Sequence, residues 1–242
     1  MKEFDVVIIG SGPGGYVCAI RCSQLGMKVA IIEKYNNLGG TCLNVGCIPS
    51  KALLESSELF HKANHDFDKH GITVNPKFDF GKMVTRKNQI VDETRLGVKF
   101  LMKKNKITVF NGLGSLENEK TVLVTQKDKK TISLTAKNIV IATGSKPNNL
   151  PSIELDKKRV ITSTEALSLK DSPKKLIIIG GGAIGLEMGS VFARLGSKIQ
   201  LFDYADSIIS SMDSSLGKEL KKVLSRDLGF DFHLSHKVKS VK

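Results

Sequence analysis

The stretch FDVVIIGSGPGG at residues 4–15 indicates how the chain folds. Residues 4–9 are apolar apart from Asp5 and rich in β-branched side chains, which predicts a buried strand. A glycine-rich turn follows, a helical pattern covers residues 16–25, and a second apolar strand is expected over residues 28–33. The glycines of the turn are Gly10, Gly12, Gly14 and Gly15. This strand–turn–helix–strand order predicts a βαβ unit with a parallel sheet.

The same pattern recurs in the second half of the chain at a constant offset of 170 residues. A strand is expected over residues 175–179, a helix over 183–195 and a second strand over 198–203. The glycines of this second turn are Gly180, Gly182 and Gly185. In both copies an acidic residue, Glu33 or Asp203, stands 18 residues after the third glycine. A repeated G-x-G-x-x-G unit in this context predicts two dinucleotide-binding sites.

Each part of the repeated unit suits a dinucleotide. The first glycine permits a tight turn, the second lets the backbone approach a pyrophosphate, and the third lets the helix pack on its strand. The helix N-terminus offers free N–H groups to the phosphates, and the acidic residue accepts hydrogen bonds from ribose hydroxyls. A carboxylate also repels a 2′-phosphate, and no arginine follows Asp203, so the second site is expected to prefer NAD to NADP.

The rest of the chain completes an α/β pattern. A helix is predicted over residues 48–70, and a second one along the line Val84, Val91, Val98 and Leu101. Short strands are predicted at residues 107–110, 121–125, 131–134 and 138–142. We predict one dinucleotide-binding domain over residues 1–145, a linker over 146–172, and a second, incomplete one over 173–242. The predicted fold class is α/β, with two Rossmann-like units that have parallel sheets and a three-layer ββα/βα arrangement.

A further informative stretch is GGTCLNVGCIPSK at residues 39–51. Cys42 and Cys47 lie five positions apart, directly after a glycine pair and at the start of a helix, where the thiolate form is favoured. A zinc site would need two further ligands, and a structural disulfide is disfavoured in a reducing compartment. The residues favour a redox-active disulfide while leaving these two alternatives open.

The other two cysteines, Cys18 and Cys22, lie four positions apart in the first predicted helix. A free cysteine behaves as a small apolar side chain, and this helix needs such residues against its sheet. We therefore interpret both as core residues, and we expect no resident metal ion.

Composition excludes several classes of protein. With 40% hydrophobic and 25% charged residues, the chain is neither disordered nor fibrous. The net charge of +13 comes from scattered lysines, since only six of the 37 basic residues are arginine, so no nucleic-acid partner is expected. No apolar run approaches the roughly 20 residues of a membrane helix, and the first residues have no apolar leader segment. We expect no membrane partner and a cytoplasmic location.

Together, residues 39–51 and the two glycine turns resemble the pyridine nucleotide–disulfide oxidoreductase family. Within it, the segment IPSK at residues 48–51, the segment GGGAIGLE at 180–187 and Asp203 are similar to the dihydrolipoamide dehydrogenase branch. That branch serves 2-oxo-acid dehydrogenase and glycine cleavage complexes. The resemblance implies oxidation of protein-bound dihydrolipoamide to lipoamide, with FAD as cofactor and NAD as acceptor. A mercuric or glutathione-type reductase and a non-catalytic dinucleotide-binding fragment are the alternatives.

The resemblance also implies roles for single residues. The first domain would hold FAD and the second NAD. Cys42 would exchange with dihydrolipoamide, Cys47 would lie against the flavin, and Lys51 would pair with Glu187 near its ring. The residues expected to bind FAD are Gly10, Gly12, Gly14, Gly15, Glu33, Gly40, Thr41, Cys42, Lys51, Gly114, Thr143, Gly144 and Ser145. Those expected to bind NAD are Gly180, Gly182, Ala183, Ile184, Gly185, Glu187, Asp203 and Val238.

Members of the family are longer than this chain. Their later part completes the FAD domain and adds an interface domain, whose His–Glu pair serves the partner subunit. The resemblance therefore implies a C-terminally truncated chain without the interface domain, a homodimer in the full-length family, and a lipoyl-bearing protein as partner. None of the five histidines stands in a His-x-x-Pro setting followed by Glu. We therefore expect no useful turnover of dihydrolipoamide by this chain alone.

Overall fold

The computed structural model describes residues 2–148 and 150–241, and the chain divides into two compact units. The first unit comprises Met1–Ile48 and Gln89–Lys146, and the second comprises Pro49–Asn88 and Pro147–Lys242. Helices α3 (Cys47–His65) and α4 (Phe80–Lys104) each contribute residues to both units.

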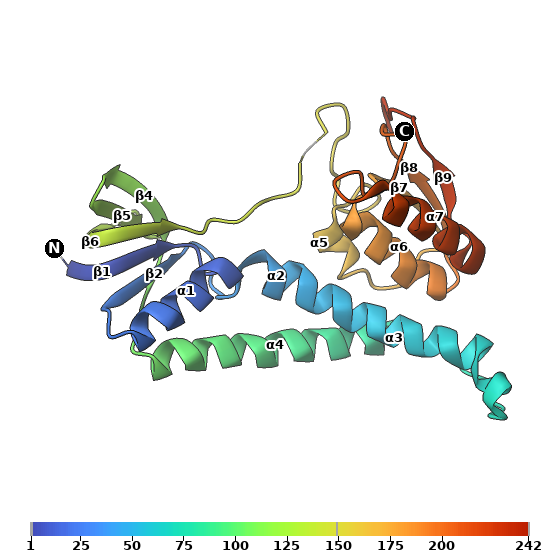
Figure 1. The fold of residues 1–242 in the computed structure, drawn as a ribbon, viewed down its shortest axis with the longest axis horizontal. Coiled ribbons are helices and arrows are strands. Elements are labelled where there is room, and N and C mark those ends of the chain that lie inside the picture. The colour runs from blue at the N-terminus through green and yellow to red at the C-terminus, as the bar shows by residue number, and fades with distance from the viewer. Residues whose placement is uncertain (1, 149, 242) are drawn as a thin grey trace. The chain divides into compact units, whose positions relative to one another are not determined.

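A six-stranded sheet forms the frame of the first unit (Figure 1). In sheet order its strands are β3 (Thr108–Asn111), β2 (Val29–Glu33), β1 (Lys2–Ile9), β6 (Thr131–Ile141), β5 (Thr121–Thr125) and β4 (Leu113–Asn118). The first four run parallel, whereas β6, β5 and β4 pair antiparallel. The sheet is therefore mixed and not wholly parallel as predicted, because short hairpin turns join β4 to β5 and β5 to β6.

The carboxyl end of β1 is the topological switch point of this sheet. Strand β2 pairs with one edge of β1 and β6 with the other. The chain between β1 and β2 passes through helix α1 (Pro13–Gln24). In open α/β sheets, ligands bind at the carboxyl ends of the strands where the order reverses. Gly10, which follows the last residue of β1, therefore stands where a ligand is expected.

The core of the first unit lies on both faces of β1 and β2. Val7 and Ile32 pack on one face with residues of β5 and β6, while Ile8 and Ile31 pack on the other with Ala19 of α1. All five side chains are almost fully buried. Because both faces are covered there, residues 6–9 of β1 and 29–32 of β2 are continuous apolar runs instead of an alternating pattern.

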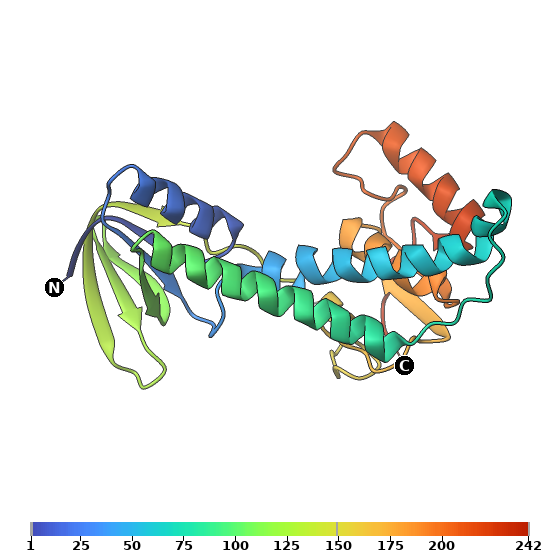
Figure 2. The ribbon, with the colours of Figure 1, turned by 90° about the horizontal axis from the view of Figure 1, so that it is seen from below.

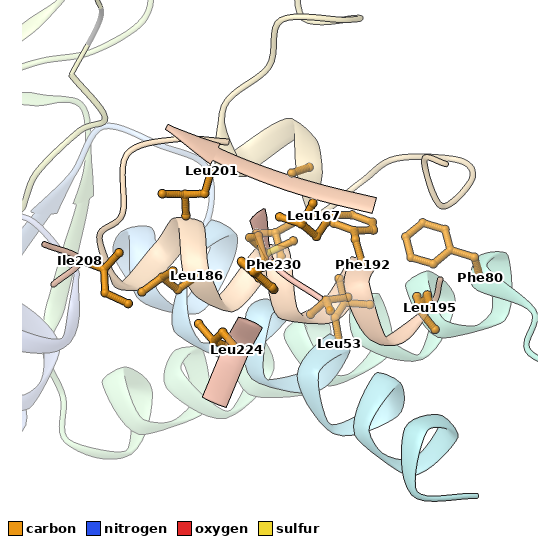
Figure 3. Close-up of a cluster of buried hydrophobic side chains, with 14 residues drawn as sticks. Leu53, Phe80, Leu167, Leu186, Phe192, Leu195, Leu201, Ile208, Leu224 and Phe230 are labelled. Atoms are coloured by element: carbon orange, nitrogen blue, oxygen red, sulfur yellow. The ribbon is translucent and has the colours of Figure 1, made fainter. Parts of the chain in front are cut away.

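The second unit contains a three-stranded parallel sheet in the order β7–β8–β9. Its elements are α5 (Ser163–Ala166), β7 (Lys175–Ile179), α6 (Ala183–Arg194), β8 (Lys198–Phe202), α7 (Ser214–Leu228) and β9 (Asp231–His233). Figure 3 shows its core, in which Phe192 of α6 lies among side chains that include Leu53 of α3 and Phe80 of α4. In this unit α3 and α4 lie side by side (Figure 2), and Arg86 donates to Glu55 at 2.6 Å.

Helix α4 carries most of the predicted apolar line, with Val91 and Val98 buried and Val84 half-buried. Leu101, however, is exposed, and the neighbouring Met102 is buried in its place. The helix predicted over residues 48–70 ends at His65, and a separate 3-10 turn follows at Phe67–His70. Of the helices in residues 2–148 and 150–241, none is both long and apolar enough to cross a membrane.

The structure also differs from the prediction in its strands and in the expected linker. The strands expected at residues 131–134 and 138–142 form the single strand β6, and the exposed polar strand β4 was not predicted. The segment expected as a linker over residues 146–172 contains α5, which a capping box between Thr162 and Glu165 begins. Leu167 then enters the core of the second unit, with 3% of its surface exposed. That part of the segment is therefore packed structure.

Candidate dinucleotide and disulfide sites

The turn after β1 has glycine at two positions where a side chain has no room. Gly10 has a φ of 103°, and a Cβ there would overlap the carbonyl oxygen of Ala142. A Cβ on Gly15 would overlap the carbonyl oxygen of Gly10, because α1 begins directly against the end of β1. Gly14 differs, since a Cβ there would meet no atom within 4 Å. No side chain caps the start of α1, and Gly14 in its first turn is exposed, which suits a bound anion.

Glu33 ends β2 beside this turn and is only 4% exposed. Its Oε2 accepts hydrogen bonds from the backbone N–H of Ser11 at 3.1 Å and from the Ser11 hydroxyl at 2.5 Å. Its Oε1 accepts from the N–H of Tyr35 at 2.9 Å. A carboxylate offers about four acceptor positions, so these three donors leave roughly one for a ribose hydroxyl. The glycine motif pointed to Glu33, whereas Ser11, an unspecified position of that motif, was missed.

Cys42 and Cys47 form a disulfide, as the sequence predicts, with their Cα atoms 4.6 Å apart. Cys42 lies in the short helix α2 (Gly40–Val45), and Cys47 is the first residue of α3. Between the two helices, a Cβ on Gly46 would lie 2.9 Å from the carbonyl oxygen of Thr41, so the loop requires glycine there. Cys47 is exposed and Cys42 half-buried, so a thiol from solution has access to the bond.

Helix α2 begins against the first glycine turn. The N–H of Gly39 donates to the carbonyl oxygen of Ser11 at 2.9 Å and to its hydroxyl at 3.2 Å. A Cβ on Gly40 would lie 2.6 Å from the Cα of Gly12, so the two backbones touch. This contact places Cys42, two residues after Gly40, beside the predicted pyrophosphate site.

Two side chains that sequence reasoning missed hold α2 in place. Asn44 donates through Nδ2 to the carbonyl oxygen of Gly40 at 2.8 Å. Its Oδ1 accepts from Nε of Arg95, in α4, at 2.7 Å. No sequence pattern links Asn44 with Arg95, because the two residues are 51 positions apart.

Other predicted members of the first site lie at the same end of the sheet. A Cβ on Gly114, in β4, would lie 3.0 Å from Cγ2 of Ile9. A Cβ on Gly10 would lie 3.2 Å from the Cα of Thr143. Gly144 and Ser145 continue from Thr143 in exposed, irregular chain. The structure thus brings Gly114 and Thr143 to the end of β1, close to the first glycine turn.

The second glycine turn repeats the geometry of the first. Gly180 has a φ of 109°, and a Cβ on Gly185 would lie 2.5 Å from its carbonyl oxygen. Gly182 faces open space, with no atom within 4 Å of an added Cβ. Ala183 begins α6 without a side-chain cap, and Ile184 is 62% exposed beside it. The start of α6 therefore offers the same kind of open anion site as the start of α1.

Asp203 directly follows β8, which is a position similar to that of Glu33 at the end of β2. Its Oδ2 accepts from the N–H of Gly181 at 2.5 Å, and its Oδ1 accepts from the N–H of Ala205 at 2.9 Å. These two bonds leave roughly two acceptor positions, enough for both hydroxyls of one ribose. Val238 lies half-buried in irregular chain after β9, and its place beside an adenine stays a prediction.

Lys51 of α3 and Glu187 of α6 form an ion pair with a 2.7 Å contact between Nζ and Oε1. The hydroxyl of Ser50 also donates to Glu187, at 3.4 Å. The lysine side chain is 58% exposed and the glutamate 32%. An ion pair this exposed adds at most about 1 kcal/mol to stability. The resemblance predicted the two residues as partners, and the structure brings them together.

Cys18 and Cys22, the free cysteines of the described chain, lie one helical turn apart in α1. Their sulfur atoms are 3.9 Å apart. Both pack against the apolar cluster under α1 but are only half-buried, so their interpretation as core residues is correct only in part. Partial burial, together with the neighbouring Cys22 thiol, raises the pKa of the Cys18 thiol.

Comparisons with known proteins match nearly the whole chain. Residues 4–242 match the family model described as pyridine nucleotide-disulphide oxidoreductase. Dihydrolipoyl dehydrogenase 1, mitochondrial, of Arabidopsis thaliana is 48% identical over 240 residues, which are 99% of this chain and 47% of that protein. Dihydrolipoyl dehydrogenase 3 of Pseudomonas putida is 48% identical over 239 residues, 98% of this chain and 51% of that protein.

A solved structure gives the same picture. The Cu(II) complex of the HOCl-induced flavoprotein disulfide reductase RclA from Escherichia coli matches with a TM-score of 0.84 and 29% identity. The match covers 100% of this chain and 51% of that one. It confirms the predicted α/β fold class. The chain spans about half the length of the curated relatives it matches.

Proposed function

Because the chain belongs to the pyridine nucleotide-disulphide oxidoreductase family, we propose that it serves the oxidation of protein-bound dihydrolipoamide to lipoamide, with FAD as cofactor and NAD as acceptor. The observation that carries the proposal is the Cys42–Cys47 disulfide, whose helix begins against the first glycine turn. The relatives named dihydrolipoyl dehydrogenase support this choice of substrate over mercury or glutathione.

The residues around the first glycine turn fit the adenosine diphosphate part of FAD. The uncapped start of α1 is open at Gly14, which suits a pyrophosphate. Glu33 is buried beside it and keeps an acceptor position for a ribose hydroxyl. We accordingly assign FAD to the proposed domain over residues 1–145.

The second glycine turn fits NAD by the same argument. The start of α6 is open at Gly182, and Asp203 keeps acceptor positions for two hydroxyls. Its carboxylate would repel a 2′-phosphate, which favours NAD over NADP. We assign NAD to the proposed domain over residues 173–242.

The proposed exchange moves two electrons from dihydrolipoamide to the protein disulfide. One lipoyl thiolate attacks Sγ of Cys42, a bond forms between these sulfurs, and the bond to Cys47 breaks, so that Cys47 leaves as a thiolate. The second lipoyl thiolate then attacks the lipoyl sulfur of the mixed disulfide, which closes the lipoamide ring and releases the sulfur of Cys42. Dihydrolipoamide is oxidised to lipoamide, the Cys42–Cys47 disulfide is reduced to two thiols, and the two lipoyl protons pass to the cysteines or to solvent.

The position of Cys47 supports its role as leaving group. It is the first residue of the 19-residue helix α3, whose N-terminus stabilises a thiolate. FAD, when bound, supplies the two-electron chemistry that connects the reduced cysteines with NAD. We propose that Lys51 presents its ammonium group to the flavin, while Glu187 holds that group in place through the 2.7 Å ion pair.

The partners follow from the substrate. A lipoyl-bearing protein of a 2-oxo-acid dehydrogenase or glycine cleavage complex would deliver dihydrolipoamide, and the full-length protein would be a homodimer. The cytoplasmic location expected from the sequence stays a prediction.

Dihydrolipoamide in excess is expected to convert Cys42 and Cys47 from a disulfide to two thiols, because the exchange needs only these two residues of the chain. Each sample is quenched in acid, denatured, alkylated and analysed by peptide mapping. Cys18 and Cys22 should be alkylated in every sample, and Cys42 and Cys47 only after dihydrolipoamide. Oxidised lipoamide is the matched control and should change nothing.

Two results would contradict the proposal. One is alkylation of Cys42 before any reductant is added. The other is a disulfide that a phosphine reductant opens but dihydrolipoamide does not, because such a bond would be structural.

A further inference from the structure

Helix α1 carries a second pair of sulfurs that the proposed function does not use. Cys18 and Cys22 lie one turn apart, their Sγ atoms are 3.9 Å apart, and both are free thiols. Each is half-buried, so the pair is open to solvent on one side and rests on the apolar cluster beneath α1 on the other.

The spacing does not suit a disulfide. Side chains one helical turn apart have Cβ atoms about 5–6 Å apart, whereas a disulfide needs Cβ atoms about 3.5–4.5 Å apart. Closing the bond would require the helix to unwind between Pro13 and Gln24, where it is regular. The two sulfurs therefore stay close but unbonded.

The same spacing suits a bridging metal ion. Zinc binds thiolate sulfur at about 2.3 Å with tetrahedral angles, which places two sulfurs about 3.8 Å apart. The observed separation of 3.9 Å agrees with this value without any movement of the helix. Thiolates are also the ligands that thiophilic divalent cations select.

We propose that Cys18 and Cys22 form a two-sulfur site on α1 for a thiophilic divalent cation such as zinc or cadmium. Within the described residues, no group of three or more His, Cys, Asp or Glu side chains is arranged to hold a metal ion, so water completes the coordination. On binding, each thiol loses its proton to solvent, two sulfur–metal bonds form, and two metal-bound waters leave. Oxidation states do not change.

The site is chemically separate from the redox pair. In the oxidised chain, Cys42 and Cys47 are bonded to each other and offer no thiolate to a cation. Titration of the oxidised chain thus reports on Cys18 and Cys22 alone among its cysteines, and the outcome does not depend on which disulfide substrate the protein uses.

Cadmium is the probe for the test, because its bonds to sulfur absorb in the near ultraviolet. The oxidised chain is expected to bind one cadmium ion with this absorption and to release two protons per ion. Cys18→Ser and Cys22→Ser should each lower the affinity roughly a hundredfold, since the chelate becomes a single ligand. Cys42→Ser/Cys47→Ser should bind cadmium as the unchanged chain does.

A variant that keeps the number of cysteines but moves one of them tests whether cadmium binding depends on the spacing of the two thiols. In Cys22→Ser/Ser23→Cys the second thiol lies five residues after Cys18, on another face of α1, so the chelate should be lost. Circular dichroism verifies that the variants fold. The proposal is overturned if the unchanged chain shows no sulfur–cadmium absorption, or if either Cys22→Ser or the Cys22→Ser/Ser23→Cys variant binds cadmium as tightly as the unchanged chain.

Discussion

Replacing Gly15 with alanine is expected to lower the free energy of unfolding of the first unit by about 1–3 kcal/mol, the usual cost of forcing extra atoms into a packed site. The new Cβ would overlap the carbonyl oxygen of Gly10, so α1 and β1 would have to separate. Affinity for FAD should also fall by about tenfold or more, because the N–H groups at the start of α1 move with the helix.

Gly14→Ala is the matched control, because nothing lies within 4 Å of its Cβ. Alanine there should leave stability unchanged or raise it slightly. Urea unfolding followed by tyrosine fluorescence is a suitable measurement, since Tyr16 and Tyr35 lie in the first unit and the chain has no tryptophan. Equal stability of Gly15→Ala and Gly14→Ala would contradict the close contact between Gly15 of α1 and the carbonyl oxygen of Gly10.

Asp203→Asn is expected to weaken NAD binding by about ten- to a hundredfold, which corresponds to the roughly 1.5–3 kcal/mol of one charge-assisted hydrogen bond. NADP binding should weaken less or improve, because the repulsion of its 2′-phosphate is removed. Asparagine also places an amide N–H₂ where the carboxylate accepts from Gly181 or Ala205, so some loss is common to both nucleotides. The ratio of the two affinities therefore isolates the effect of the charge.

The measurement is calorimetric titration of each variant with NAD and with NADP. Asp206→Asn is the control, since Asp206 lies three residues further on and accepts from the hydroxyl of Ser207. It should leave the ratio unchanged. An unmutated chain that binds both nucleotides equally well would refute the assignment of selectivity to Asp203.

The elements that carry the dinucleotide sites were predictable because strong local signals define them. The strand before each glycine turn is a continuous apolar run, and the helix after it ends at a glycine, Gly26 or Gly196. Strand β4 was missed because its sequence LGSLEN mixes apolar and polar residues and is largely exposed, and its extended form depends on hairpin pairing with β5. The antiparallel part of the sheet was also missed. The hydrophobic pattern of a sequence does not show whether neighbouring strands pair parallel or antiparallel, because that depends on the folded chain.

Residues of the candidate site divide in a similar way. Glu33, Asp203, Cys42 and Cys47 were found because their spacing from the glycines has a chemical meaning. Ser11, Asn44 and Arg95 were not, because each acts through a partner brought near by the fold, such as Arg95 of α4 on Asn44 of α2 at 2.7 Å. Residues that hold a reactive group in place do so through contacts between distant segments, and such contacts cannot be recognised in the local sequence.

FAD binding by the first unit, at the glycine turn beside the Cys42–Cys47 disulfide, is the step on which the proposed function depends. Its most direct test is an equilibrium titration of the FAD-free chain with FAD, followed by flavin fluorescence, in parallel with Gly14→Asp. A carboxylate at position 14 stabilises the start of α1 but repels a pyrophosphate there. The unchanged chain is expected to bind one FAD, and the folded Gly14→Asp variant to bind it with an affinity about tenfold or more lower. Absence of saturable binding, or equal affinity of the two proteins, would contradict it.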